Sequence, residues 1–253
     1  MTWRTAPPDR ALALAPAAVH VWRVALVQPP AVMDELAGTL DAGERDRAAR
    51  FHFARDRAAY TVARGALRTL AARYLGCAAA AIGFGYRAKG KPFLAAPSGM
   101  LPGEPGFDLR FNVSHSDGVG LVCFARGCEV GVDVERRRPL DDLLSLARIS
   151  FSADEYARLC QVAPDHRAAA FFACWSRKEA FIKLTGEGVS QLADFDVSLE
   201  PGAPARLVRV AGEPPGALRW SLHDLPEIAG YAAALAVEGE PARIESWEFA
   251  SGP

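Results

Sequence analysis

Short apolar runs recur along the chain and predict β-strands. The run Val19–Val27 (VHVWRVALV) is rich in β-branched and aromatic residues, which favour a pleated, half-buried surface. Further runs lie between Asp-Gly and Arg-Gly turns and in the tail from about residue 194. They predict strands over Phe111–Ser116, Gly120–Phe124, Val130–Val134, Leu218–Leu222, Tyr231–Val237 and Ile244–Phe249.

A spacing of three and four residues predicts helices elsewhere. The segment from Asp41 to Leu75 is helical in character, and Gly76 is a plausible stop. Its buried face is predicted to comprise Val62, Ala66, Leu67, Leu70 and Tyr74. Ala168–Leu184, which ends at Thr185-Gly186, has the strongest helical pattern in the chain. A capping-box pattern at Ser152–Glu155 opens a shorter helix.

The order of these elements predicts an α+β fold. A strand, a long helix and strands are followed by a strand, helices and strands. We therefore expect a pseudo-twofold duplicate of two similar α/β halves, residues 1–127 and 128–253. Residues 1–18 and the Gly/Pro-rich stretch 89–107 are predicted to be irregular, and Ala81–Tyr86 to be a short strand.

Composition narrows the class of protein. Half of the 253 residues are hydrophobic and 23% are charged, as in an ordinary globular protein. The net charge of −1 argues against nucleic acid or an anionic membrane as a partner. No apolar run reaches the roughly 18 residues of a transmembrane helix, and we expect no signal peptide. Five cysteines without a CxxC pair predict reduced thiols in a cytoplasmic protein and argue against zinc.

Lysine is scarce, and its distribution is uneven. Only four of the 29 basic residues are lysines, and they lie in two short segments, at Lys89 and Lys91 and at Lys178 and Lys183. Either the clustering is chance, or these segments need the compact ammonium group, which often binds phosphate.

Two acidic patterns could hold a metal ion. Asp133 and Glu135 alternate on a predicted strand and so share one face, while Glu179 and Lys183 are four apart on a predicted helix. Carboxylates that converge in this way suit Mg²⁺ with substrate phosphates. Taken singly, each pattern is equally compatible with solvated acids at a strand end or with a surface Glu–Lys pair.

Two further segments could bind an anion. The run Phe111–Ser116 (FNVSHS) presents hydroxyl, imidazole and backbone N–H groups, but the chain lacks the G-x-S-x-G elbow of many serine hydrolases. The stretch from Gly85 to Lys91 fits G-x4-G-K, yet Pro92 replaces the Ser or Thr of a P-loop. We therefore reject an ATPase, although a loop with two lysines can still bind phosphate.

Together these segments resemble the 4′-phosphopantetheinyl transferases, specifically the larger monomeric type that modifies synthase carrier proteins. The resemblance rests on FARD at 53–56 followed by Arg64, GKP at 90–92, FNVSHS at 111–116, GVDVE at 131–135 and WSRKEAFIKLTG at 175–186. It implies that 4′-phosphopantetheine moves from coenzyme A to a serine of an apo acyl or peptidyl carrier protein, with release of adenosine 3′,5′-bisphosphate. Mg²⁺, or Mn²⁺, is the implied cofactor. The resemblance also implies that the coenzyme and the active site lie in the cleft between the two halves. The motifs do not distinguish whether the carrier serves fatty acid biosynthesis or secondary metabolite biosynthesis.

The resemblance also assigns roles to residues of this chain. It implies that the metal ligands are Asp133, Glu135 and Glu179, and that Lys183 lies near the pyrophosphate. Asp133, Glu179 and Lys183 are the expected catalytic residues, with Glu179 as our candidate general base. The expected coenzyme-binding residues are Arg47, Lys89, Gly90, Lys91, Asn112, Ser114, His115 and Lys183.

Two rival functions share some of these features. A metal-dependent phosphodiesterase or nuclease would also use acids with a Glu–Lys pair. A non-catalytic module that binds coenzyme A or a carrier protein is the second rival, and binding without transfer would distinguish it.

Overall fold

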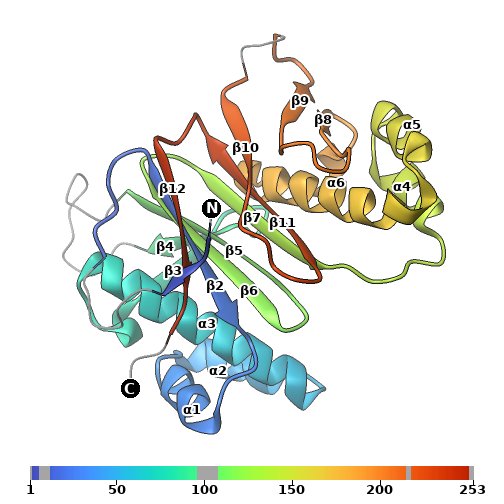
Figure 1. The fold of residues 1–253 in the computed structure, drawn as a ribbon. Helices are drawn as coiled ribbons and strands as arrows, with labels where there is room; N and C mark the ends of the chain where they lie inside the picture. The colour runs from blue at the N-terminus through green and yellow to red at the C-terminus, as the bar shows by residue number, and fades with distance from the viewer. Residues whose placement is uncertain (1, 6–11, 96–107, 215–217, 251–253) are drawn as a thin grey trace.

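The structure is a computed structural model that describes residues 2–5, 12–95, 108–214 and 218–250. Two β-sheets pack against each other, and a long helix covers the outer face of each (Figure 1). This mixed arrangement of helices and sheets confirms the α+β prediction. No helix in the described ranges has the length and apolar character needed to cross a bilayer.

The larger sheet combines strands from both ends of the chain. Its strand order is β1-β12-β2-β6-β5, with β1 Arg4–Thr5, β12 Arg243–Glu248, β2 Ala18–Ala25, β6 Val119–Arg126 and β5 Leu109–Ser116. Strand β12 pairs in parallel with both β1 and β2, whereas β2, β6 and β5 are antiparallel neighbours. The last strand of the segment predicted as the second half therefore belongs to the sheet of the first half.

The smaller sheet has the order β10-β11-β7, with β10 Trp220–Asp224, β11 Tyr231–Glu238 and β7 Val130–Arg136. Its pairings are antiparallel, and β7 is an edge strand. Two short hairpins complete the sheets, β3 Gly83–Tyr86 with β4 Pro92–Ala95, and β8 Phe195–Val197 with β9 Leu207–Val210.

Helices occupy the outer layers (Figure 1). The first half contains α1 Pro30–Gly38, α2 Ala42–Ala49 and α3 Ala54–Leu75, followed by the single turn η1 Ala79–Ala81. The second half contains α4 Leu143–Ser150, α5 Ala153–Gln161, α6 Pro164–Thr185 and the turn η2 Val189–Gln191. Gly76 and Gly186 end α3 and α6 with φ of 66° and 72°, a left-handed conformation that glycine adopts without strain.

Three apolar clusters hold the layers together. In the first, Leu67 and Leu70 of α3 pack on Trp22 and Phe124 of the larger sheet. The second cluster joins α6 to the alanines of β11, and the third lies between the two sheets. The third cluster includes Val21, Leu121, Cys123, Val132, Val134 and Leu235, all fully buried. Apolar burial of this kind is the main term that favours folding.

Most of the predicted elements are present. The predicted strands, the split helical segment from 41 to 75, the capping box at Ser152 and the long helix before Gly186 are all confirmed. The buried face from Val62 to Tyr74 is also confirmed. Two predictions of irregular structure were wrong in part, because β1 lies within 1–18 and β4 within 89–107; residues 1, 6–11 and 96–107 of those stretches lie outside the described residues. The helices α1 and α4 were not predicted.

Candidate active site between the two halves

Strand β7 presents acids on one face and apolar side chains on the other. Val132 and Val134 are fully buried between the sheets, while Asp133 and Glu135 face α6. Gly131 permits this approach, because a Cβ there would lie 2.1 Å from the Ala180 carbonyl oxygen of α6. The absence of a side chain at residue 131 therefore lets the acids of β7 meet the residues of α6.

Helix α6 brings Glu179 and Lys183 to this face. The ammonium of Lys183 donates to Asp133 Oδ1 at 2.6 Å and to Ser114 Oγ at 2.8 Å. Trp175, one turn before Glu179, lies near Glu135 and opposes the rise in the pKa of that carboxyl. The contacts of three separate elements, β5, β7 and α6, thus converge on the predicted acids.

Alternate side chains of β5 connect the larger sheet to the edge of β7. Asn112 Oδ1 accepts from Val132 N at 3.2 Å, Ser114 Oγ from Val134 N at 3.4 Å and Ser116 Oγ from Arg136 N at 3.1 Å. The two serines also donate to the acids. Ser114 Oγ lies 2.8 Å from Asp133 Oδ1, and Ser116 Oγ lies 3.0 Å from Glu135 Oε2.

Burial and mutual repulsion raise the pKa values of two acids in this site. Burial raises the pKa of Glu179, and the neighbouring Asp133 carboxylate raises it further, against the opposing effect of Lys183. Burial and Asp133 raise the pKa of Glu135 in the same way. The ionised form of both acids would therefore be stabilised by a nearby positive charge more than a solvated carboxylate would be.

One oxygen in the site lacks a partner. Asp133 is 2% exposed, and its Oδ2 atom is buried without a hydrogen bond, whereas Oδ1 has two. A buried, unsatisfied carboxylate oxygen is costly unless something else binds it. Among the described residues, no cluster of three or more His, Cys, Asp or Glu side chains is already arranged as a metal site. Even so, the orphaned oxygen and the mutually repelling acids fit a hard divalent cation that prefers oxygen ligands.

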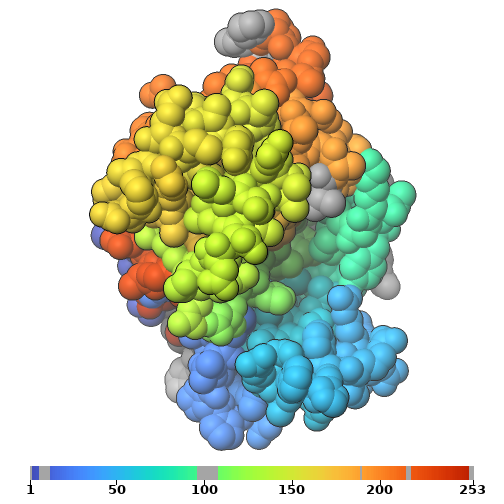
Figure 2. Space-filling view, turned by 90° about the vertical axis from the view of Figure 1, so that its right-hand side faces the viewer, coloured from blue at the N-terminus to red at the C-terminus, as the bar shows by residue number. Residues whose placement is uncertain are grey.

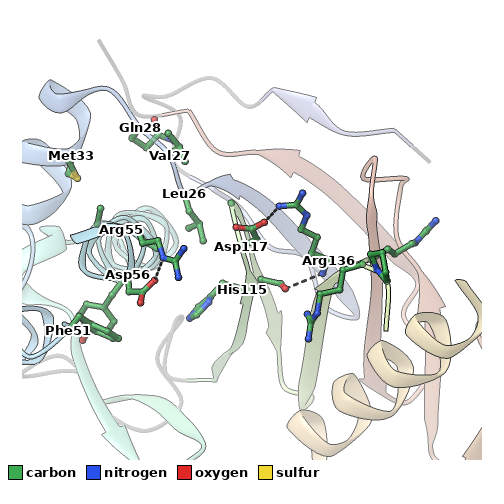
Figure 3. Close-up of a pocket in the computed structure, with 18 residues that line it drawn as sticks. Leu26, Val27, Gln28, Met33, Phe51, Arg55, Asp56, His115, Asp117 and Arg136 are labelled. Atoms are coloured by element: carbon green, nitrogen blue, oxygen red, sulfur yellow. Dashed lines mark hydrogen bonds and ion pairs between the residues drawn. The ribbon is translucent and has the colours of Figure 1, made fainter. Parts of the chain in front are cut away.

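A hollow beside these acids divides into two adjoining cavities. Figure 2 shows the surface hollowed between the first-half helices and the segment after β7. The larger cavity, about 920 Å³, is lined by Arg55, Asp56 and the loop Arg136–Pro139, and His115 projects into it (Figure 3). The second cavity, about 310 Å³, shares Phe51, Tyr60 and His115 with the first.

The second cavity collects several predicted coenzyme-binding residues. Arg47, Gly90, Ser114 and His115 all line it. The Arg47 guanidinium lies 5.6 Å from the centre of the Tyr60 ring. Burial and the Lys183 charge lower the pKa of His115, which favours the neutral imidazole. The combination of two arginines, Arg47 and Arg64, with the backbone at Gly90 and an imidazole donor suits an anionic ligand.

Three predicted coenzyme-binding residues make other contacts. Lys91 is buried and donates to Glu129 Oε2 and the Leu184 carbonyl, each at 2.6 Å. Lys89 pairs with Glu187 at the surface, and Asn112 accepts from β7. Lys91 thereby fastens the first half to the end of α6.

Lys178, one of the clustered lysines, has a structural role inside the core. Its ammonium is fully buried and binds Glu155 Oε2 and the Phe195 carbonyl, each at 2.7 Å. A phosphate-binding role for Lys178 is therefore wrong, because no ligand reaches a group enclosed in the core of the second half.

Sequence reasoning missed Ser116 and the side chains that line the cavities, such as Tyr60. Ser116 was within the predicted FNVSHS motif but received no role. The period-two repeat of Asn112, Ser114 and Ser116 on one strand face was the available signal.

Comparison with known proteins covers nearly the whole chain. Residues 129–236 match the 4′-phosphopantetheinyl transferase superfamily, and residues 30–125 match the 4′-phosphopantetheinyl transferase N-terminal family. The chain is 36% identical to the 4′-phosphopantetheinyl transferase HetI of a Nostoc species, over 98% of each protein. It is 34% identical to a 4′-phosphopantetheinyl transferase of Bacillus subtilis, over 66% of this chain and 70% of that protein. It is 32% identical to a phosphopantetheinyl transferase of a Thraustochytrium species, over 74% of this chain and 68% of that protein.

Proposed function

The chain belongs to the 4′-phosphopantetheinyl transferase superfamily, and on this premise we propose its reaction. It transfers 4′-phosphopantetheine from coenzyme A to a serine of an apo acyl or peptidyl carrier protein and releases adenosine 3′,5′-bisphosphate. The observation that carries the proposal is the Lys183–Asp133–Ser114 cluster, with its orphaned oxygen, beside a cavity lined by Arg47 and His115.

The acids of the site would hold a divalent cation. Asp133, Glu135 and Glu179 would be its protein ligands, and Asp133 Oδ2 has no competing partner. When bound, Mg²⁺ or Mn²⁺ would neutralise pyrophosphate charge and supply Lewis-acid polarisation.

The coenzyme would occupy the hollow with its phosphates near the first-half residues. Arg47, Gly90, Ser114 and His115 line the cavity and would bind these phosphates. Lys89 and Lys91, on the adjoining loop, would bind the coenzyme only by exchanging their present partners, Glu187 and Glu129, for phosphate. Lys183, 29% exposed, would lie beside the pyrophosphate and stabilise charge that develops during transfer.

Glu179 would act as the general base. The carrier serine would give its hydroxyl proton to the Glu179 carboxylate, while its oxygen bonds to the phosphorus that bears pantetheine. The bond from this phosphorus to the bridging oxygen then breaks, and the bisphosphate leaves with the electron pair. A raised pKa brings Glu179 nearer to the range in which a carboxylate accepts a proton effectively.

The test is the mass of a carrier protein after incubation with the enzyme, coenzyme A and Mg²⁺. A panel of apo carriers should include at least one that gains a phosphopantetheine, and EDTA or Asp133→Ala should abolish the gain. Glu179→Gln tests the base separately, since near-normal turnover would assign that role elsewhere. Coenzyme A hydrolysis without a carrier would instead favour a phosphodiesterase, and binding without transfer would favour a binding module.

A further inference from the structure

The junction of the two sheets is made by side chains rather than by a backbone ladder. Strand β7 is the edge of the smaller sheet, and its outward N–H groups at 132, 134 and 136 need acceptors. The side chains of three residues of β5 each accept a hydrogen bond from one of these N–H groups: Asn112, Ser114 and Ser116. We call each of these hydrogen bonds a rung. These three rungs set the register of β7 against β5.

In two of the three rungs, the side chain that accepts from β7 also donates a hydrogen bond to an acid. Ser114 Oγ accepts from β7 and donates to Asp133, and Ser116 Oγ accepts from β7 and donates to Glu135. Asn112 makes the same kind of backbone contact, but the residue of β7 that corresponds to Asp133 and Glu135 there is Gly131, which has no carboxylate. The serine rungs therefore combine a structural contact with an orienting one.

The orienting contact has a consequence for Asp133. Its Oδ1 atom is held by both Ser114 and Lys183, so the carboxylate cannot rotate freely and Oδ2 stays unbonded in the buried site. Ser116 restrains Glu135 in a similar way through its hydrogen bond to Oε2. Hydrogen bonds that orient ligating carboxylates typically matter for metal affinity.

We propose that Ser114 and Ser116 are positioning residues that present Asp133 and Glu135 to the divalent cation. Each hydroxyl ties the carboxylate to the backbone of its own strand and leaves carboxylate oxygen atoms available. This inference rests on the proposed function, because it needs the cation that the three acids would share. It gives Ser116 a role as a positioning residue, and it gives Ser114 this role in addition to coenzyme binding.

Ser116 gives the cleaner test, because it is only partly buried and does not bond Lys183, whereas Ser114 does. The measurement is Mn²⁺ affinity by electron paramagnetic resonance, on full-length protein saturated with coenzyme A and without a carrier, so that no turnover occurs. Ser116→Ala should weaken Mn²⁺ binding by about 10-fold or more, within the usual effect of removing an outer hydrogen bond to a ligand. Coenzyme A affinity should change far less. Ser116→Thr restores a hydroxyl and should recover most of the affinity.

Val132→Ala is the matched control. It removes buried apolar contacts on the opposite face of the same strand and should lower the melting temperature while Mn²⁺ affinity stays within about twofold. Ser114→Ala should behave like Ser116→Ala; if it fails to fold, the Ser116 pair of variants decides the question alone.

The outcomes separate the inference from the proposed function. Mn²⁺ affinity of Ser116→Ala within twofold of the unaltered protein overturns the inference and leaves the transferase reaction standing. An equal loss in Val132→Ala also overturns it, since general movement of β7 would then be the cause. If the unaltered protein binds no Mn²⁺, both the inference and the metal site of the proposed function fall.

Discussion

Two lysine–carboxylate pairs on helix α6 differ in how completely their atoms are bonded. Lys178 and Glu155 are 2.7 Å apart with both side chains fully buried, and Lys183 and Asp133 are 2.6 Å apart in the cleft. Glu155 also accepts from Val197 N through Oε1 and from Ser152 N through Oε2. Asp133, by contrast, keeps Oδ2 unbonded, and Lys183 is 29% exposed.

The difference matches the two roles that the proposed function gives these pairs, one structural and one in the reaction. A pair whose acceptor oxygens are all bonded within the chain has nothing left to offer a ligand, and it stabilises the core around it. A pair that is accessible on one side and has a spare oxygen pays a desolvation cost for an atom that only a ligand can satisfy. Full bonding, rather than the presence of charge, is therefore the better guide to which lysine serves the reaction.

The largest expected effect comes from breaking the buried pair. Lys178→Ala leaves Glu155 charged in the core and should lower the free energy of unfolding by about 3–5 kcal/mol, measured by urea denaturation. Replacing both partners together, as Lys178→Met with Glu155→Leu, should restore part of this stability. A loss below about 1 kcal/mol in the single variant would contradict the structural role of this pair.

The cleft pair should show the opposite pattern. Lys183→Ala should lower the turnover of carrier modification by about 10²–10³-fold, because a cation aimed at developing phosphate charge is lost. Its free energy of unfolding should change much less than that of Lys178→Ala, since Lys183 is partly exposed. Turnover and urea denaturation measured on both variants give the comparison, and a stability loss equal to that of Lys178→Ala would refute it.

A smaller effect is expected where α6 meets β7. Gly131→Ala places a Cβ against the Ala180 carbonyl and should cost about 1–3 kcal/mol of stability while it moves α6 away from the acids. Turnover should therefore fall as well. Gly38→Ala is the control, because a Cβ there meets nothing within 4 Å, and it should leave stability and turnover nearly unchanged. Unchanged behaviour of Gly131→Ala would show that the close approach does not position the site.

The smallest effect tests a His–Glu pair in the larger sheet. His20 Nε2 lies 3.7 Å from Glu245 Oε2, yet burial lowers the pKa of His20 below its ordinary value of 6.5 despite this partner. The unfolded chain then binds a proton more readily than the folded one, so stability is greatest above pH 6.5 and falls as the pH drops below it. Urea denaturation at pH 7.5 and 5.5 should show a smaller decline in His20→Gln. An equal decline would mean that His20 does not contribute to it.

Periodicity accounts for the elements that the sequence predicted well. The buried face of α3 and the strands β5, β6 and β7 have strong local patterns, so their types could be read without tertiary information. Helix α1 was missed because Pro29-Pro30 looks like a loop, although proline at the first helical position is favourable. The pseudo-twofold duplication and the boundary at residue 127 stay predictions.

The sequence predicted which residue types form the site, but it predicted less well which residues contact one another. The motifs identified Asp133, Glu179 and Lys183, which the structure brings close to one another. They could not show that Lys178 is enclosed, because its partner Glu155 is 23 residues away and meets it only through packing of α5 on α6. Contacts that depend on how separate elements pack leave little trace in local sequence.

The place of β12 constrains the order in which the protein can be completed during translation. This strand, residues 243–248, lies between β1 and β2, so the sheet that carries Ser114 and Ser116 has a vacant position until those residues leave the ribosome. Such a long-range pairing is slow to form compared with local contacts. A nascent chain can therefore fold α3 and the β5–β6 hairpin early, while closure of the larger sheet waits for the last strand to be synthesised.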